Sequence, residues 1–110
     1  MAYDKELADR LRAALSFEQG ITEKAMFGGL AFLLEGHMLA AAVGGGGLML
    51  RVDPATSGAL LERDGVQPME MRGKPITGWL LVDGAVADTE DTLRGWLEHS
   101  LVYVRTIPAK

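Results

Sequence analysis

The chain has 110 residues, 48% of them hydrophobic and 24% charged, which is ordinary for one globular domain and excludes a disordered chain. Cysteine is absent, so disulfides, thiolate catalysis and cysteine-based metal sites are excluded, and a reducing compartment is favoured. The net charge of −4 argues against nucleic acid as the main partner. No apolar run approaches the roughly 20 residues of a membrane helix. We therefore expect a single cytoplasmic domain over residues 1–110.

The first half of the chain predicts one helix and three strands. Apolar residues recur at helical spacing near the start, at Tyr3, Leu7, Leu11, Ala14 and Leu15. The apolar run over residues 24–34 and the segment 38–43 are typical of two strands joined by a tight turn. The glycines at 44–47 predict a flexible turn before a third strand at 48–52.

The second half predicts a helix, two strands and a last helix. Asp53 is placed to accept hydrogen bonds at the start of the second helix, and Pro54 fits its first position. Strands are expected at residues 69–72 and 77–82, and Asp88 is expected to cap the last helix. The sequence therefore predicts an α+β domain in which helices cover mainly one face of an antiparallel sheet.

The stretch TEKAMFGGLAF at residues 22–32 resembles the N-terminal domain of the TfoX/Sxy family, and three other stretches support the resemblance in family order. They are AYDKELA at residues 2–8, LMLRV at 48–52, and Pro68-Met69 through Gly73-Lys74-Pro75 to Gly78-Trp79. The resemblance implies a two-layer α/β domain, α-β(3)-α-β(2)-α, with a five-stranded antiparallel sheet similar to secretion-chaperone-like folds. Longer family members carry a second, C-terminal domain and regulate natural competence for DNA uptake.

A candidate interaction surface lies in the run over residues 24–34. Alternate side chains of a regular strand point to opposite faces, and both rows are apolar here: Met26, Leu30, Phe32 and Leu34 form one, and Phe27, Ala31 and Leu33 the other. Since the helices cover one face, the second row needs a self-associating partner, a bound ligand or another chain. Gly28 and Gly29 fit a close approach by such a partner, although a bulge or bend is favoured. We assign the interaction surface to Met26, Phe27, Gly28, Gly29, Ala31 and Leu33.

A second candidate site collects the basic residues Arg51, Arg72 and Lys74, with Trp79 available for stacking. These side chains could surround a small anion such as a carboxylate or phosphate. The alternative, which we favour, is that the arginines protect an edge strand from aggregation and that Trp79 is a core residue.

No residue pattern indicates catalysis, a metal or a cofactor. The two histidines, His37 and His99, lack the spacing of a metal or hydrolase motif, and Gly44 to Gly47 are not followed by the Lys-Ser/Thr of a phosphate loop. We therefore expect a non-enzymatic regulatory or interaction module that forms a homodimer or binds another protein. The alternative is an anionic-ligand-binding or enzyme-like domain using Arg51, Arg72 and Lys74. Because the chain ends at Lys110, just past the last predicted helix, we expect a stand-alone N-terminal domain, for which the competence role has little support.

Overall fold

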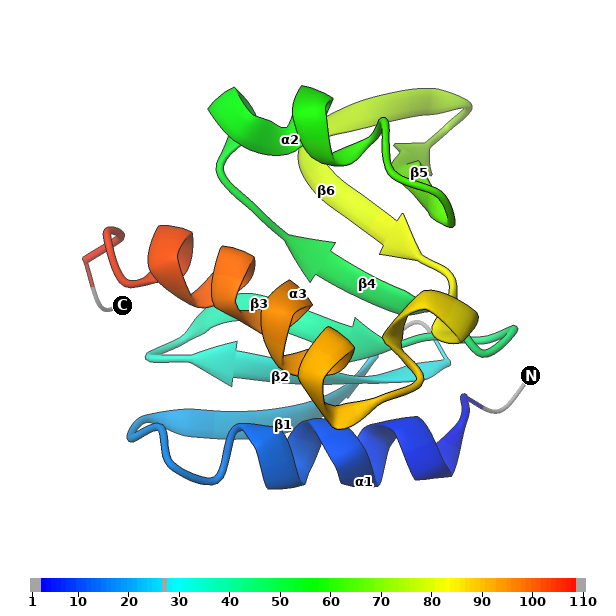
Figure 1. Ribbon diagram of the computed structural model, residues 1–110. Coiled ribbons are helices and arrows are strands. Elements are labelled where there is room, and N and C mark those ends of the chain that lie inside the picture. Colours follow the sequence, from blue (N-terminus) through cyan, green and yellow to red (C-terminus); the bar gives the residue numbers. More distant parts are fainter. Residues whose placement is uncertain (1–2, 27, 109–110) are drawn as a thin grey trace.

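The computed structural model describes residues 3–26 and 28–108, and it places helices on one side of a single antiparallel sheet (Figure 1). The first helix, α1, spans Lys5–Ala14. It begins after Asp4, because the carboxylate of Asp4 accepts hydrogen bonds from the backbone N–H groups of Glu6 and Leu7 at 2.9 and 3.2 Å. Leu7 and Leu11 are buried on its inner side.

The sheet has six strands in the order β1-β2-β3-β4-β6-β5. Their bounds are β1 Ile21–Met26, β2 Gly29–Leu34, β3 His37–Ala42, β4 Leu48–Arg51, β5 Val66–Met71 and β6 Lys74–Val82. The α+β class and the antiparallel pairing are confirmed, but the prediction of five strands was wrong. The run over residues 24–34 is a β1–β2 hairpin, because Gly28 adopts a φ of 75° in the turn and lets the chain reverse. The likeness to secretion-chaperone folds stays a prediction.

The remaining helical elements are α2 (Pro54–Leu60), the short 3₁₀ helix η1 (Gly84–Ala87) and α3 (Glu90–Val104). Asp53 caps α2 as predicted, since its carboxylate accepts from the backbone N–H of Ala55 at 2.9 Å. The expected cap of α3 was wrong by one residue: Thr89, not Asp88, is the N-cap, and its side chain exchanges hydrogen bonds with Thr92. None of the described helices has the length and hydropathy needed to cross a bilayer.

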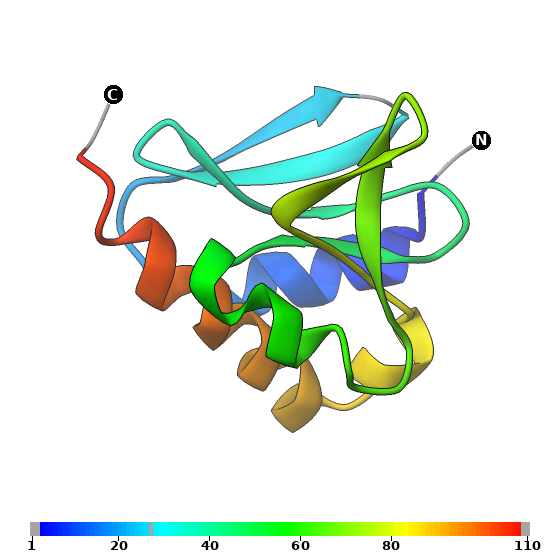
Figure 2. The same ribbon diagram turned by 90° about the horizontal axis from the view of Figure 1, so that it is seen from above.

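The core lies between the helices and the inner face of the sheet. Its largest fully buried side chains come from both layers: Leu11, Leu15, Phe32, Leu39, Leu48, Leu50, Leu80, Leu93 and Leu97. One buried polar group joins the layers, because the hydroxyl of Ser100 on α3 donates to the carbonyl of Leu39 on β3 at 2.8 Å. From above, the helices lie on one side of the sheet, and the turn of the β5–β6 hairpin projects toward the other side (Figure 2).

Candidate interaction surface

The helix-free face of the sheet carries a continuous row of side chains. Residues paired directly across neighbouring strands share one face, and the pairing joins one residue from each strand: Lys24, Ala31, Ala41, Met49, Leu81 and Gln67. The residues next to them along the strands, including Phe32 and Leu50, belong to the core beneath the helices. This set, the outer row, therefore faces away from the helices.

The central side chains of the outer row are buried, and those around them remain accessible to solvent. Ala31 and Ala41 are 0% and 3% exposed, yet neither belongs to the core cluster, so their neighbours on the outer face shield them. Met49 and Leu81 are half-buried and keep part of their apolar surface accessible. A second pairing, Thr22 with Leu33 and Leu33 with Met38, adds two more half-buried apolar side chains to this face.

The structure divides the predicted interaction residues between the face and the turn. Ala31 and Leu33 lie on the face opposite Leu30 and Phe32, as the alternation predicted. Met26 pairs with Gly29 on the outer face, not on the face of Leu30, because it belongs to a separate strand in which the alternation starts again. Phe27 lies outside the described residues.

The two glycines serve the fold itself. Gly28 forms the hairpin turn, and a Cβ atom on Gly29 would lie 2.4 Å from the carbonyl oxygen of Ala42. The close approach at Gly29 is therefore made by the backbone of β3, within the same chain.

The sequence interpretation missed Met38, Met49 and Leu81, which extend the outer face across the central strands. Met49 could have been found from its place between Leu48 and Leu50, because strand alternation puts it on the face opposite those two buried residues. Met38 was hidden by an irregularity in the β2–β3 pairing between Phe32 and Leu33, which changes the alternation along β3.

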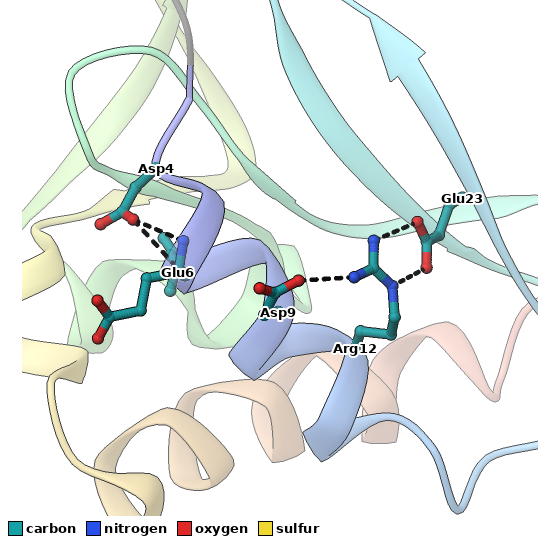
Figure 3. Close-up of polar contacts among 6 residues, drawn as sticks. Asp4, Glu6, Asp9, Arg12 and Glu23 are labelled. Atoms are coloured by element: carbon teal, nitrogen blue, oxygen red, sulfur yellow. Dashed lines mark hydrogen bonds and ion pairs between the residues drawn. The ribbon is translucent and has the colours of Figure 1, made fainter.

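An ion-pair cluster attaches the edge strand β1 to α1 (Figure 3). The Arg12 guanidinium donates from Nε and Nη2 to both oxygens of Glu23, at 2.6 and 2.8 Å, and from Nη1 to Asp9 at 2.8 Å. The hydrogen bonds from Arg12 lower the pKa of Glu23, and those to Glu23 raise the pKa of Arg12. Glu23 thus faces the helices, and its neighbour Lys24 falls on the outer face.

The predicted basic site is separated into two places. The guanidinium carbon of Arg51 lies 5.2 Å from the ring centre of Trp79, its partner across β4 and β6, and 5.7 Å from that of Tyr103 on α3. Arg72 is exposed in the β5–β6 turn, and Lys74 begins β6. Lys74 precedes Trp79 by five positions, and β6 bends between them at Gly78, where φ is 88°. The structure therefore brings Arg51 and Trp79 into contact, and among the described residues it shows no contact of Arg72 or Lys74 with them.

The other polar groups considered for chemistry lie apart from one another. The Nε2 atom of His37 is 2.7 Å from the carbonyl oxygen of Pro108, and the His99 ring lies beside Trp96. Gly45 and Gly46, with φ of 86° and 85°, form the β3–β4 turn at the edge of a hollow of about 320 Å³. Within residues 3–26 and 28–108, no three His, Asp or Glu side chains are grouped as metal ligands would be.

Helices on one face of a six-stranded antiparallel sheet, with an apolar outer face, define the protein as a two-layer α+β domain. The family of TfoX N-terminal domains matches residues 13–103, most of the chain, so the chain belongs to this family. No curated protein matches the sequence at a significant level.

Proposed function

We propose that this TfoX N-terminal domain is a non-enzymatic regulatory module that binds a protein partner through the outer face of its sheet. The observation that carries the proposal is the accessible apolar surface of Leu33, Met38, Met49 and Leu81, which none of the described helices covers. The partner is a second copy of the chain or another protein, and the cytoplasm is the proposed location.

Two properties of this surface suit protein binding. Methionine is flexible and polarizable, so Met38 and Met49 can adapt to the shape of a partner. The buried alanines lie at the centre of the outer row, and the accessible area is spread over several strands. An extended apolar face of this kind fits a macromolecule better than a metabolite.

The proposal is tested by comparing two substitutions that add the same charge on opposite sides of the domain. Met49→Lys places a charge on the outer face, and Val102→Lys places one on α3, where Val102 is 58% exposed. We expect self-association of the wild type in size-exclusion chromatography with light scattering at high micromolar concentration. Met49→Lys should weaken it about tenfold or more, because a charge would be desolvated in the interface, while Val102→Lys leaves it unchanged.

A heterologous partner is tested with the same variants in a pull-down from the native host. A partner of the outer face is retained by the wild type and by Val102→Lys and is lost with Met49→Lys. A strictly monomeric wild type, together with capture that Met49→Lys does not alter, would rule out the outer face as the interface.

A further inference from the structure

Arg51 differs from four other arginines of the chain in its bonding. The side chains of Arg10, Arg12, Arg94 and Arg105 each donate to a carboxylate or a backbone carbonyl. Arg51 is half-buried, and among the described residues its guanidinium has no hydrogen-bond acceptor or ion-pair partner. Its contacts with Trp79 and Tyr103 use the positive charge but not the five N–H donors of the guanidinium.

The topology explains why the guanidinium is held in this place. The pairing of β3 with β4 ends at Ala40 and Leu50, so Arg51 extends past β3 and has a strand neighbour only on the β6 side, at Trp79. Tyr103 reaches Arg51 from α3. The aromatic rings therefore restrain a charged group with unused donors, which is the arrangement of a prepared anion site.

The surroundings select the class of anion. Lys74 lies five positions before Trp79 on β6, and Lys24 lies three strands from Arg51, roughly 14 Å. A single guanidinium matches the charge and planar shape of one carboxylate better than the double charge of a phosphate. Met49, two positions along β4 on the same face, offers an apolar surface beside it.

The charges around the guanidinium differ between its two sides. The hollow beside Tyr103 is lined by Asp53 and Glu98, which repel an anion. On β1 to β4 and β6, the outer-face residues paired in register include Lys24 and Arg51 and no carboxylate, and the exposed Glu70 lies on β5 beyond them. We propose that Arg51, Trp79 and Tyr103 form a subsite for a carboxylate at the end of β4, with the apolar part of the ligand placed along Met49.

This subsite does not depend on the proposed interaction surface, because a free carboxylate can occupy it without a protein partner. The carboxylate belongs either to a small aliphatic acid or to an acidic side chain of a protein segment. The recognition chemistry is the same in both cases, so the experiment needs one probe for each source.

The test is a titration of ¹⁵N-labelled protein followed by NMR. Hexanoate is compared with uncharged hexanamide, and a leucine-rich peptide with one Glu is compared with the same peptide carrying Gln. We expect the indole N–H of Trp79 and the Nε–H of Arg51 to shift saturably with the carboxylate probes, at least tenfold more tightly than with the neutral ones. The indole of Trp96, which donates to the carbonyl of Val86, is the internal reference and should not shift.

Two variants distinguish specific binding of a carboxylate at Arg51 from a general attraction of anions to the positive charges of the domain. Arg51→Lys keeps the charge but loses the planar fork, so hexanoate should bind at least about fivefold more weakly. Lys74→Gln removes one positive charge at the hairpin turn and should leave the affinity unchanged. These two variants decide the matter without a variant that removes the charge at position 51.

Three results would overturn the proposal: equal binding of hexanamide, equal weakening by Lys74→Gln, or full affinity in Arg51→Lys. If both carboxylate probes bind as expected, their affinities are then compared with each other. A tenfold higher affinity for hexanoate identifies a small acid as the natural source, and a tenfold higher affinity for the Glu peptide identifies a protein segment.

Discussion

Gly29 and Gly95 show two opposite consequences of lacking a side chain. At Gly29 a Cβ atom would lie 2.4 Å from the carbonyl oxygen of Ala42, so the β2–β3 pairing depends on glycine. At Gly95, inside α3, a Cβ atom would have no neighbour within 4 Å. Glycine there has no packing role within the described chain, and it costs the helix conformational entropy.

The two glycines therefore respond in opposite ways to alanine. Gly95→Ala should raise the free energy of unfolding by about 0.5–1 kcal/mol, because alanine is the better helix former. Gly29→Ala should lower it by about 1–3 kcal/mol, since strands must move apart to admit the methyl group. Urea denaturation of both variants checks this pair of values. A loss of stability in Gly95→Ala would contradict the open space seen around that residue.

At the same scale, sequence reasoning identified the starts of α2 and α3 to within a residue. Asp53 and Pro54 start α2 as predicted, because capping depends on local chemistry. The start of α3 was misplaced because Asp88 and Thr89 are both good capping residues, and only the geometry of the reciprocal bonds with Thr92 decides between them. The contact of Arg51 with Tyr103 links residues far apart in the sequence, so no local pattern could indicate it.

Among the elements, β1 depends most on polar contacts. Its four middle residues are exposed, and only its ends, Ile21 and Met26, are half-buried. The Arg12–Glu23 pair therefore supplies part of what holds this edge strand against α1. Ion pairs at the surface are weakened by solvent and salt, so this attachment depends on solution conditions.

The attachment of β1 should weaken in acid. The pKa of Glu23 is lowered by Arg12 in the folded state, so the pair stabilises the fold above the unfolded value of about 4.3, and the contribution is lost as pH falls through the lower folded pKa. Glu23→Gln should thus lower the Tm at neutral pH, and its difference from the wild type should shrink below about pH 4.

Thermal unfolding across this pH range provides the measurement, with the exposed Glu62, which has no ion pair among the described residues, changed to Gln as the control. A Tm difference that stays constant into acid would show that Glu23 acts through packing and not through its charge.

The β1–β2 hairpin is the element that sequence reasoning did not resolve. The run over residues 24–34 lacks the polar break that usually marks a turn, and its only signal is the Gly28-Gly29 pair, which also fits a bulge. β1 itself is mostly exposed, so it shows no apolar alternation. By contrast, β4 and β6 were found because their buried residues alternate with outer-face residues.

For the whole molecule, the helix and sheet layers could be predicted, but the order of the strands could not. A hairpin pairs two strands that are consecutive in the chain. The pairing of β6 with β4 instead joins strands that are not consecutive, and it places β6 between β4 and β5. That choice is made by long-range burial, as Leu50 and Leu80 pair on the core face at 0% and 1% exposure. The apolar character of both faces was visible in the sequence, but its extent over β3, β4 and β6 required the pairing register.

The junction of β4 with β6 has a consequence for the dynamics of the domain. Four paired positions, from Leu48–Val82 to Arg51–Trp79, make the strand connection between the β1–β4 meander and the β5–β6 hairpin. Segments with separate ladders often open as separate cooperative units below the global unfolding energy. We expect amide hydrogen exchange to be faster in β5 and β6 than in β3, measured by mass spectrometry or NMR, and uniform protection would contradict this division. Arg51 and Trp79 are the last pair of the junction. An anion bound there would therefore hold β4 and β6 together and slow the opening of the hairpin.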